Sequence, residues 1–197
     1  MTHLTRRTFV ASLVALSFSR AANGAPMQYV LQADRSTVGF IYRLSGQAAK
    51  GSMPVKRAAV AIDFNALARS SIDVEVDVRR TKTGLIFATE ALKAVSVLDA
   101  RAHPSIRFRS TKIRLNGRGR LSDGAEIDGL LTIKGTTKPV TLKAALFRQA
   151  GTQAGDLSQL SFQVKGRVSR AAFGVTGYAN LVEDGIDLEI IARVRRA

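Results

Sequence analysis

The sequence contains no cysteine, which excludes disulfide bonds, thiolate zinc sites and cysteine nucleophiles. Histidine is almost as scarce: with only His3 and His103 in 197 residues, a metal site built from imidazoles is not expected. Long apolar runs are also missing, since none approaches the ~20 residues that a membrane-spanning helix needs. The 46% hydrophobic content that remains fits one globular domain with a sizeable core.

Acidic residues are few relative to basic ones: 15 Asp and Glu against 30 Lys and Arg give a formal net charge of +15. Such an excess favours anionic partners, such as a phospholipid surface or nucleic acid. Arginines gather in the segment 107–120, where they would suit phosphate groups. The aromatic residues interleaved with them fall on the opposite strand face, so no platform for base stacking is predicted. We therefore expect contact with an anionic membrane surface and not with nucleic acid.

Residues 1–25 have the order of an export signal: basic residues, a short apolar run, then small residues. Arg6 and Arg7 resemble a twin-arginine signal, and a general secretory signal with two incidental arginines is the alternative. Cleavage after Ala21 or after Gly24 would obey the small-residue rule. We expect a periplasmic or secreted protein whose processed chain carries a charge of about +12.

From Tyr29 onward, apolar and polar residues alternate with the period of half-buried β-strands. The clearest case is the segment 71–79. Its apolar residues Ile72, Val74, Val76 and Val78 alternate with Asp73, Glu75, Asp77 and Arg79. A helix would spread these charges around its circumference, whereas a strand places them on one face. About eight or nine such strands are predicted.

The segment 81–102 breaks this alternation and contains helix-forming residues. Leu92, Val95 and Leu98 fit one helical face, which predicts one short helix or an irregular crossover. It should end before Pro104, because a residue that precedes proline disfavours helical backbone angles.

Three further features locate breaks between strands. The parity of apolar residues slips after Phe108, which predicts a β-bulge near residues 110–112. Residues 122–124, Ser-Asp-Gly, predict a hairpin tip. Residues 149–159 are polar and predict a loop.

The stretch Asp128–Leu142, DGLLTIKGTTKPVTL, reads as a β-hairpin with one apolar face. Gly135 can adopt the positive φ that a tight turn needs, and Pro139 would begin the second strand. With the other strands, this hairpin predicts an all-β fold over residues 26–197, an antiparallel barrel or sandwich with one short helical crossover. The apolar face of nearly every strand needs one shared interior, and an eight-stranded antiparallel β-barrel has room inside for side chains or one ligand.

Four blocks of the sequence resemble the YceI-like family and occur in its order: YVLQADRSTVGF, ARAHPSIRFRST, GLLTIKGTTKPVTL and SRAAFGV. The third is the most specific. The fourth places Arg170, Phe173 and Gly174 in the spacing of the family's Arg-x-x-Phe-Gly segment. The resemblance extends from about Tyr29 to the C-terminus. Arg35 departs from it, because many members have a histidine at that position.

The resemblance implies an exported, lipocalin-like barrel that holds a polyisoprenoid, an isoprenoid quinone or a similar long-chain amphiphile as carrier or store. It implies no chemistry on that lipid and no other cofactor. The alternative is that the inward aromatic residues fill the core. The predicted ligand-binding residues are Phe40, Tyr42, Ile62, Phe64, Val76, Phe108, Leu131, Leu142, Phe162, Arg170, Phe173, Tyr178 and Ile190.

Arg170, Tyr178 and Arg35 are the candidates to meet a polar head group, because arginine forms bidentate bonds with carboxylates and phosphates. Each could instead be structural or solvated. An enzyme acting on an isoprenoid-type lipid would need a convergent acid–base pair, which the sequence does not supply, so no catalytic or metal-binding residues are predicted. A filled barrel that acts in the envelope through its basic surface is a further alternative. A homodimer is compatible with the sequence.

Overall fold

The structure is a computed structural model that describes residues 25–117, 123–147, 153 and 155–197. Almost all of the expected export signal, Ser122 of the expected hairpin tip and much of the expected polar loop lie outside these residues. The strands are β1 (Met27–Leu31), β2 (Thr37–Leu44), β3 (Gln47–Met53), β4 (Val55–Ile62), β5 (Ser71–Asp77), β6 (Lys82–Thr83), β7 (Ser105–Leu115), β8 (Ala125–Ile133), β9 (Thr136–Phe147), β10 (Gln159–Ser169) and β11 (Gly185–Arg196), and the α-helix is α1 (Ile86–Lys93).

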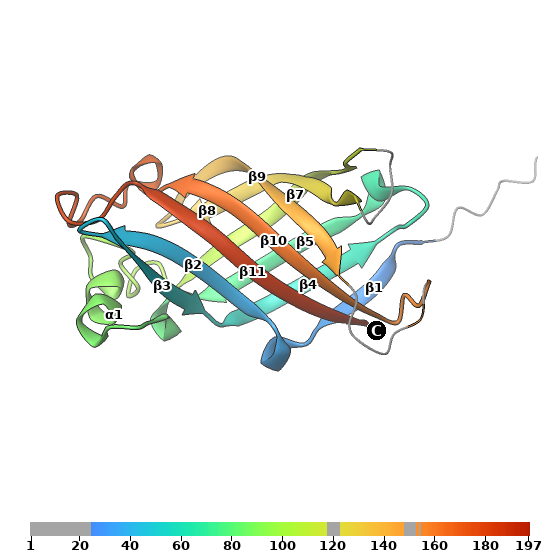
Figure 1. Cartoon of the computed structure of the whole chain (residues 1–197), viewed down its shortest axis with the longest axis horizontal. Coiled ribbons are helices and arrows are strands. Elements are labelled where there is room, and N and C mark those ends of the chain that lie inside the picture. The colour runs from blue at the N-terminus through green and yellow to red at the C-terminus, as the bar shows by residue number, and fades with distance from the viewer. Residues whose placement is uncertain (1–24, 118–122, 148–152, 154) are drawn as a thin grey trace, which may run out of the picture.

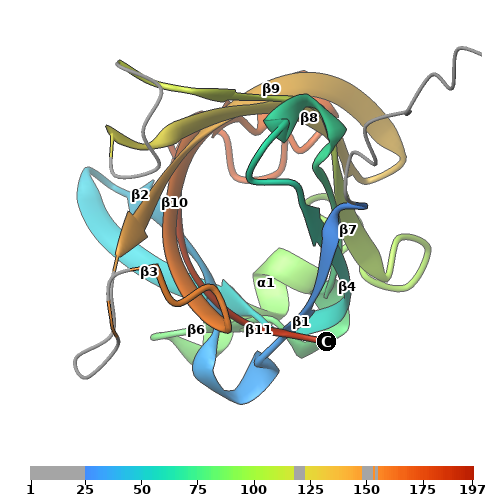
Figure 2. The ribbon, with the colours of Figure 1, turned by 90° about the vertical axis from the view of Figure 1, so that its right-hand side faces the viewer.

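The strands form one closed antiparallel sheet, because β1 pairs with β11 as well as with β4. β1 and β2 both pair with β11 and form a single barrel strand that is interrupted by the 3-10 turn Ala33–Arg35. Pro54 interrupts the next barrel strand between β3 and β4, and the turn Val78–Arg80 interrupts the third between β5 and β6. The predicted eight-stranded antiparallel barrel is confirmed (Figures 1 and 2).

The local predictions around the β8–β9 hairpin are largely confirmed. Lys134 and Gly135 have φ values of 48° and 76°, which make the tight turn between the two strands. Pro139 does not begin β9, which starts three residues earlier. Because β10 pairs with β9 only at Lys143–Phe147, Pro139 lies on a stretch with one unpaired edge, where a strand tolerates the missing N–H. The predicted bulge is also present, as a register shift between Ser110 and Lys112.

The crossover between the third barrel strand and β7 carries α1 across one end of the barrel (Figure 1). Leu92 and Leu98 pack toward the core as predicted. The prediction for Val95 was wrong: the helix ends at Lys93, Ala94 leaves the helical conformation, and Val95 is 71% exposed. Among the described helices, none is long and apolar enough to cross a membrane.

The outer face of the sheet carries ion pairs between neighbouring strands. On β5, Asp73 accepts hydrogen bonds from Arg107 of β7, with a distance of 2.8 Å from Arg107 Nε. Glu75 accepts from Lys56 of β4, also at 2.8 Å. The carboxylates that alternate along β5 therefore bind the two adjacent strands. These hydrogen bonds hold the pKa values of Asp73 and Glu75 below their ordinary values.

We expect the free energy of unfolding to decrease as the pH falls below about 4, the ordinary pKa of an aspartate. A carboxylate whose pKa is lower in the folded state than in the unfolded state stabilises the fold at pH values above its unfolded-state pKa. This contribution is lost as the pH falls through its folded-state pKa. Asp73→Asn should therefore weaken the pH dependence. Denaturant unfolding at about pH 6 and pH 3 measures it. Asp34→Asn is the control, because Asp34 is exposed and has no ion pair within the described structure. An equal effect of both variants would contradict the prediction.

Candidate ligand-binding cavity

The barrel interior contains a cavity of about 600 Å³, within the usual range for small-molecule sites. Its walls are the inward faces of the strands, with α1 and the β10–β11 loop at one end. The lining side chains are apolar except for those of Tyr42, Ser70, Arg170 and Tyr178. A barrel filled by its own side chains would leave no such volume, so the filled-core alternative is not what the structure shows.

Most of the predicted ligand-binding residues line this cavity. They are Phe40, Tyr42, Ile62, Phe64, Val76, Phe108, Leu131, Leu142, Phe162, Arg170, Tyr178 and Ile190. Phe173 does not: its side chain is 2% exposed and belongs to the core beneath the β10–β11 loop. The turn Ala171–Phe173 takes that side chain out of the strand alternation, so the parity of β10 does not apply to it.

Glycines on neighbouring strands keep the interior open. A Cβ on Gly51 would lie 2.2 Å from Cζ of Phe40, and one on Gly129 would lie 2.5 Å from the ring of Phe108. The two aromatic rings therefore lie against the barrel wall, over the glycines. Large inward side chains line the lumen in this way without filling it.

The end of the barrel opposite α1 is packed by a separate apolar cluster that includes Tyr29, Leu160 and Val194. The hydroxyl of Tyr29 donates a hydrogen bond to the carbonyl of Leu157 at 2.8 Å, and its ring meets Phe64 edge-on. Burial raises the pKa of Tyr29, so its hydroxyl remains a donor near neutral pH. This end of the cavity is therefore apolar apart from the side chain of Ser70.

Arg170 organises the loop that joins β10 to β11. Its guanidinium donates hydrogen bonds to the carbonyl oxygens of Val175 and Gly177 at 2.8 Å and of Val182 at 3.1 Å. The side chain is 8% exposed. The structural role that the sequence left open for Arg170 is thus present. Its Nε, however, has no hydrogen-bond partner within the described residues.

Tyr42 provides a second buried donor at the same end of the cavity. Its side chain is 6% exposed, lines the cavity and belongs to the buried cluster that includes Val168 and Val175. Its hydroxyl also has no partner among the described residues. An unsatisfied buried polar group is unfavourable, so each one requires an explanation. A polar ligand atom within reach of either group would satisfy it.

The other two polar candidates lie elsewhere. Tyr178 is 48% exposed at the edge of the cavity, and Arg35 lies in the turn Ala33–Arg35 and does not line it. Sequence reasoning missed Phe87 and Leu181, which also line the cavity at this edge. The apolar triplet 85–87 at the start of a short helix was the available signal.

The cavity offers little for catalysis. Its described lining contains no carboxylate and no imidazole, and its single charged group, Arg170, already serves three backbone carbonyls. Nor do three or more metal-ligating side chains come together anywhere in the described chain. The arrangement can enclose an apolar chain and donate hydrogen bonds to an oxygen at one end.

Comparisons with known proteins agree with this geometry. A family model described as the YceI-like domain matches residues 29–194. A UPF0312 protein of Serratia proteamaculans is 27% identical over 126 residues, 64% of this chain and 62% of that relative. The chain thus spans between 54% and 62% of the length of the curated relatives it matches.

Two solved structures share the fold. BcnA of Burkholderia cenocepacia has a TM-score of 0.72 at 20% sequence identity and covers 83% of this chain and 99% of its own. A polyisoprenoid binding domain from Saccharophagus degradans is described as implicated in plant cell wall breakdown. It has a TM-score of 0.61 at 10% sequence identity, and the match covers 87% of this chain and 99% of that domain.

Gly51→Ala should destabilise the fold by about 1–3 kcal/mol, because the ring of Phe40 must leave the wall to make room for the new methyl group. Denaturant unfolding measures the loss. In a double-mutant cycle, Phe40→Leu should recover much of it, since the smaller side chain removes the clash. Gly84→Ala is the matched control, because nothing lies within 4 Å of a Cβ at that position. Equal effects of the two glycine substitutions would contradict the prediction.

Proposed function

The chain belongs to the YceI-like family, and from this premise we propose that it binds a long-chain lipid, such as a polyisoprenoid, inside its barrel and holds it chemically unchanged. The observation that carries the proposal is the apolar cavity of about 600 Å³ that runs through the barrel. The fold shared with the Saccharophagus degradans polyisoprenoid binding domain supports it. The sequence pattern of residues 1–25 supports a periplasmic location for this carrier or store.

The energetics of such a lining favour a chain over a compact polar molecule. Each buried CH₂ group contributes roughly 0.8 kcal/mol, so ten of them contribute about 8 kcal/mol. Association opposes this with about 4–15 kcal/mol of lost motional freedom. An apolar tail therefore needs to fill much of the cavity before binding becomes tight. A long isoprenoid or fatty chain meets this requirement, and a short one does not.

Binding without turnover fits the chemistry of the lining. An enzyme that hydrolyses or transfers an isoprenoid diphosphate needs an acid–base pair or a metal beside the reacting bond. The described lining has neither a carboxylate nor an imidazole. Incubation with a lipid diphosphate should accordingly return the lipid unchanged.

We place the polar group of the ligand at the α1 end of the cavity, beside Tyr42 and Arg170. Tyr42 Oη and Arg170 Nε are both buried donors without a partner in the described chain. A ligand oxygen that accepts from either of them, such as a hydroxyl, a quinone carbonyl or a phosphate oxygen, would remove an unfavourable buried group. The apolar tail would then extend toward the Tyr29 end.

Val164→Trp should abolish lipid binding. Val164 lines the cavity from β10, and an indole there would occupy the space of the tail. Native mass spectrometry of the protein purified from its own periplasm, with an organic extract analysed alongside, measures the bound lipid. The unmodified protein should carry a stoichiometric long-chain adduct that Val164→Trp lacks.

Gln163→Trp is the matched control, because Gln163 is the preceding residue of β10 and lies exposed on the outer face. It should keep the adduct. The lipid proposal fails if the unmodified protein has a clean apo mass and takes up no isoprenoid or fatty ligand in vitro. An adduct that persists in Val164→Trp would place the lipid outside the cavity.

Tyr42→Phe should weaken binding of an amphiphile with an oxygen-containing head by about 2- to 10-fold, the effect of one hydrogen bond. The thermal stability of the ligand-free protein should stay equal or rise, because the hydroxyl has no partner in the described structure. Binding titrations and thermal unfolding measure the two effects. The affinity for a long hydrocarbon without a head group is the control and should not change. A large loss of stability in the ligand-free variant would instead assign the hydroxyl a structural role.

A further inference from the structure

Exposed apolar side chains are concentrated at the end of the barrel that carries α1. Six of the eight large hydrophobic side chains that are exposed in the described chain lie there. They form what we term the apolar rim: Leu85, Ile86, Phe87, Val95, Tyr178 and Leu181. Ile86 is 87% exposed and Phe87 65%. Single exposed apolar residues are ordinary, whereas a cluster of them marks a contact surface.

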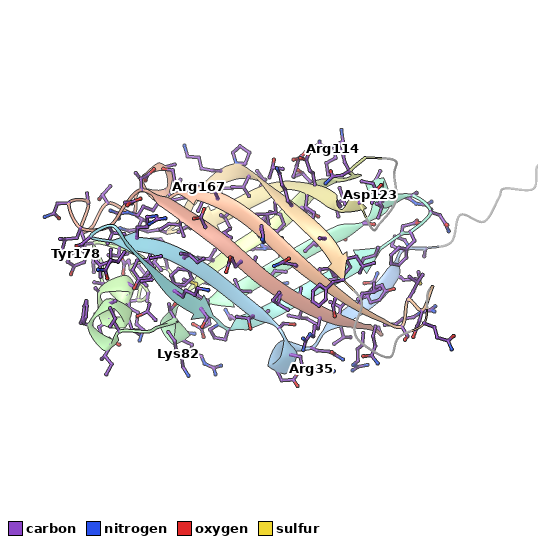
Figure 3. The ribbon with its side chains drawn as sticks, in the orientation of Figure 1. Arg35, Lys82, Arg114, Asp123, Arg167 and Tyr178 are labelled. Carbon is purple, nitrogen blue, oxygen red and sulfur yellow. The ribbon has the colours of Figure 1, made fainter. Side chains whose placement is uncertain are left out.

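Backbone hydrogen bonds hold the parts of the rim together. The N–H of Gly177 donates to the carbonyl of Ser96 at 2.9 Å, which ties the β10–β11 loop to the crossover that follows α1. The N–H of Ser45 donates to the carbonyl of Leu181 at 2.7 Å, which ties the same loop to the β2–β3 turn. The rim is therefore one surface built from two connections, and the β2–β3 turn supports it from the side. Tyr178 marks this end of the barrel in Figure 3.

The rim is also the mouth of the cavity. Among the described residues that line the cavity, only Phe87, Tyr178 and Leu181 are exposed, and all three belong to the rim. Every other lining residue is buried or half-buried. The cavity therefore meets solvent where the exposed apolar surface lies.

Tyr178 is displayed at this mouth by a strained backbone. Its φ of 57° is unusual for a residue other than glycine. The conformation is fixed because the carbonyl of Tyr178 accepts from the N–H groups of Leu181 at 3.0 Å and Val182 at 2.9 Å. Strain of this kind concentrates at functional positions. Here it presents an aromatic side chain with a polar tip, the type that favours membrane interfaces.

Cations without an ionic partner lie beside the rim. Arg80, Lys82 and Arg101 are exposed, and none of them forms an ion pair within the part of the chain that the structure describes. Figure 3 shows Lys82 on the side of the barrel below α1. Of the exposed carboxylates at this end, Glu90 and Glu183 are paired, with Lys93 and Arg43 respectively, and Asp184 accepts a hydrogen bond from the N–H of Ala171 at 2.8 Å. Exposed cations without an ion pair therefore outnumber such carboxylates around the rim in the described chain.

We propose that the apolar rim docks on an anionic phospholipid bilayer and places the mouth of the cavity against the lipid. Apolar side chains that enter the boundary between headgroups and acyl chains, flanked by Lys and Arg near lipid phosphates, are the chemistry of such a contact. A second copy of this chain fits less well, because each processed copy carries a formal charge of about +12. The inference that the cavity takes up its lipid from the bilayer rests on the proposed lipid-binding function, whereas the docking itself does not.

Vesicle co-sedimentation of the processed protein tests the proposal. The probes are vesicles of phosphatidylcholine alone and of an equal mixture with phosphatidylglycerol. We expect binding to the mixed vesicles, weakened as ionic strength rises from about 0.05 M to 0.5 M. Ile86→Glu should reduce binding roughly tenfold, because a side chain that enters the bilayer becomes charged. Ile86 lies in the rim and does not line the cavity.

Leu130→Glu is the matched control. Leu130 is an exposed apolar residue on β8, outside the rim, and its substitution changes the net charge equally. It should alter binding by less than about twofold. Equal binding by the two variants, or equal binding of the unmodified protein to both kinds of vesicle, would overturn the proposal. Self-association without vesicles that Ile86→Glu abolishes would also overturn it, by assigning the rim to a second copy.

The two proposals can fail separately. Ile86→Glu should still take up a soluble fatty ligand in the absence of vesicles, since the cavity is intact. Val164→Trp should lose that uptake and still sediment with the mixed vesicles. If Val164→Trp also failed to sediment, the rim would not act as an independent docking surface.

Discussion

Closure of the sheet is the constraint on which the rest of this molecule depends. Because β1 pairs with β11, the sheet closes on itself, and alternate residues of eight barrel strands must share one interior. That interior stays open only because large residues lie over glycines of adjacent strands. Phe40 over Gly51 and Phe108 over Gly129 are the clearest pairs. The same closure that satisfies the backbone therefore also creates an apolar space that water fills poorly.

Strand parity made most of the fold predictable from the sequence. A one-residue shift would bury the carboxylates of Asp73 and Glu75, so the alternation leaves one acceptable orientation for β5. The same parity placed most of the predicted ligand-binding residues on the cavity wall. The two residues that were misplaced had not been predicted from strand parity. Val95 was assigned to a helical face, but it follows the end of α1. Phe173 was suggested by the family resemblance, and it lies in a 3-10 turn with its side chain in the core.

Strand parity does not predict whether the barrel interior is filled or contains a cavity. An inward phenylalanine fills a core or lines a pocket according to what lies across from it, and Gly51 is eleven residues from Phe40 in sequence but its direct partner in the sheet. The mouth of the cavity is likewise formed by residues that are far apart in the sequence. Phe87 and Leu181 line the same end of the cavity only because the crossover and the β10–β11 loop are joined there by a backbone hydrogen bond. Such contacts leave almost no local signal in a single sequence.

Arg170 connects the shape of the mouth to the chemistry of the cavity. A buried guanidinium is costly unless its donors are satisfied, and the carbonyls of Val175, Gly177 and Val182 satisfy most of them. Those bonds fix the loop that carries Tyr178 and Leu181. Nε has no partner in the described chain and, like the Tyr42 hydroxyl, lies toward the α1 end, while the lining of the Tyr29 end is apolar apart from Ser70. For the lipid that we propose, this polarity favours entry tail first, with the polar group near the mouth and the chain in the depth of the barrel.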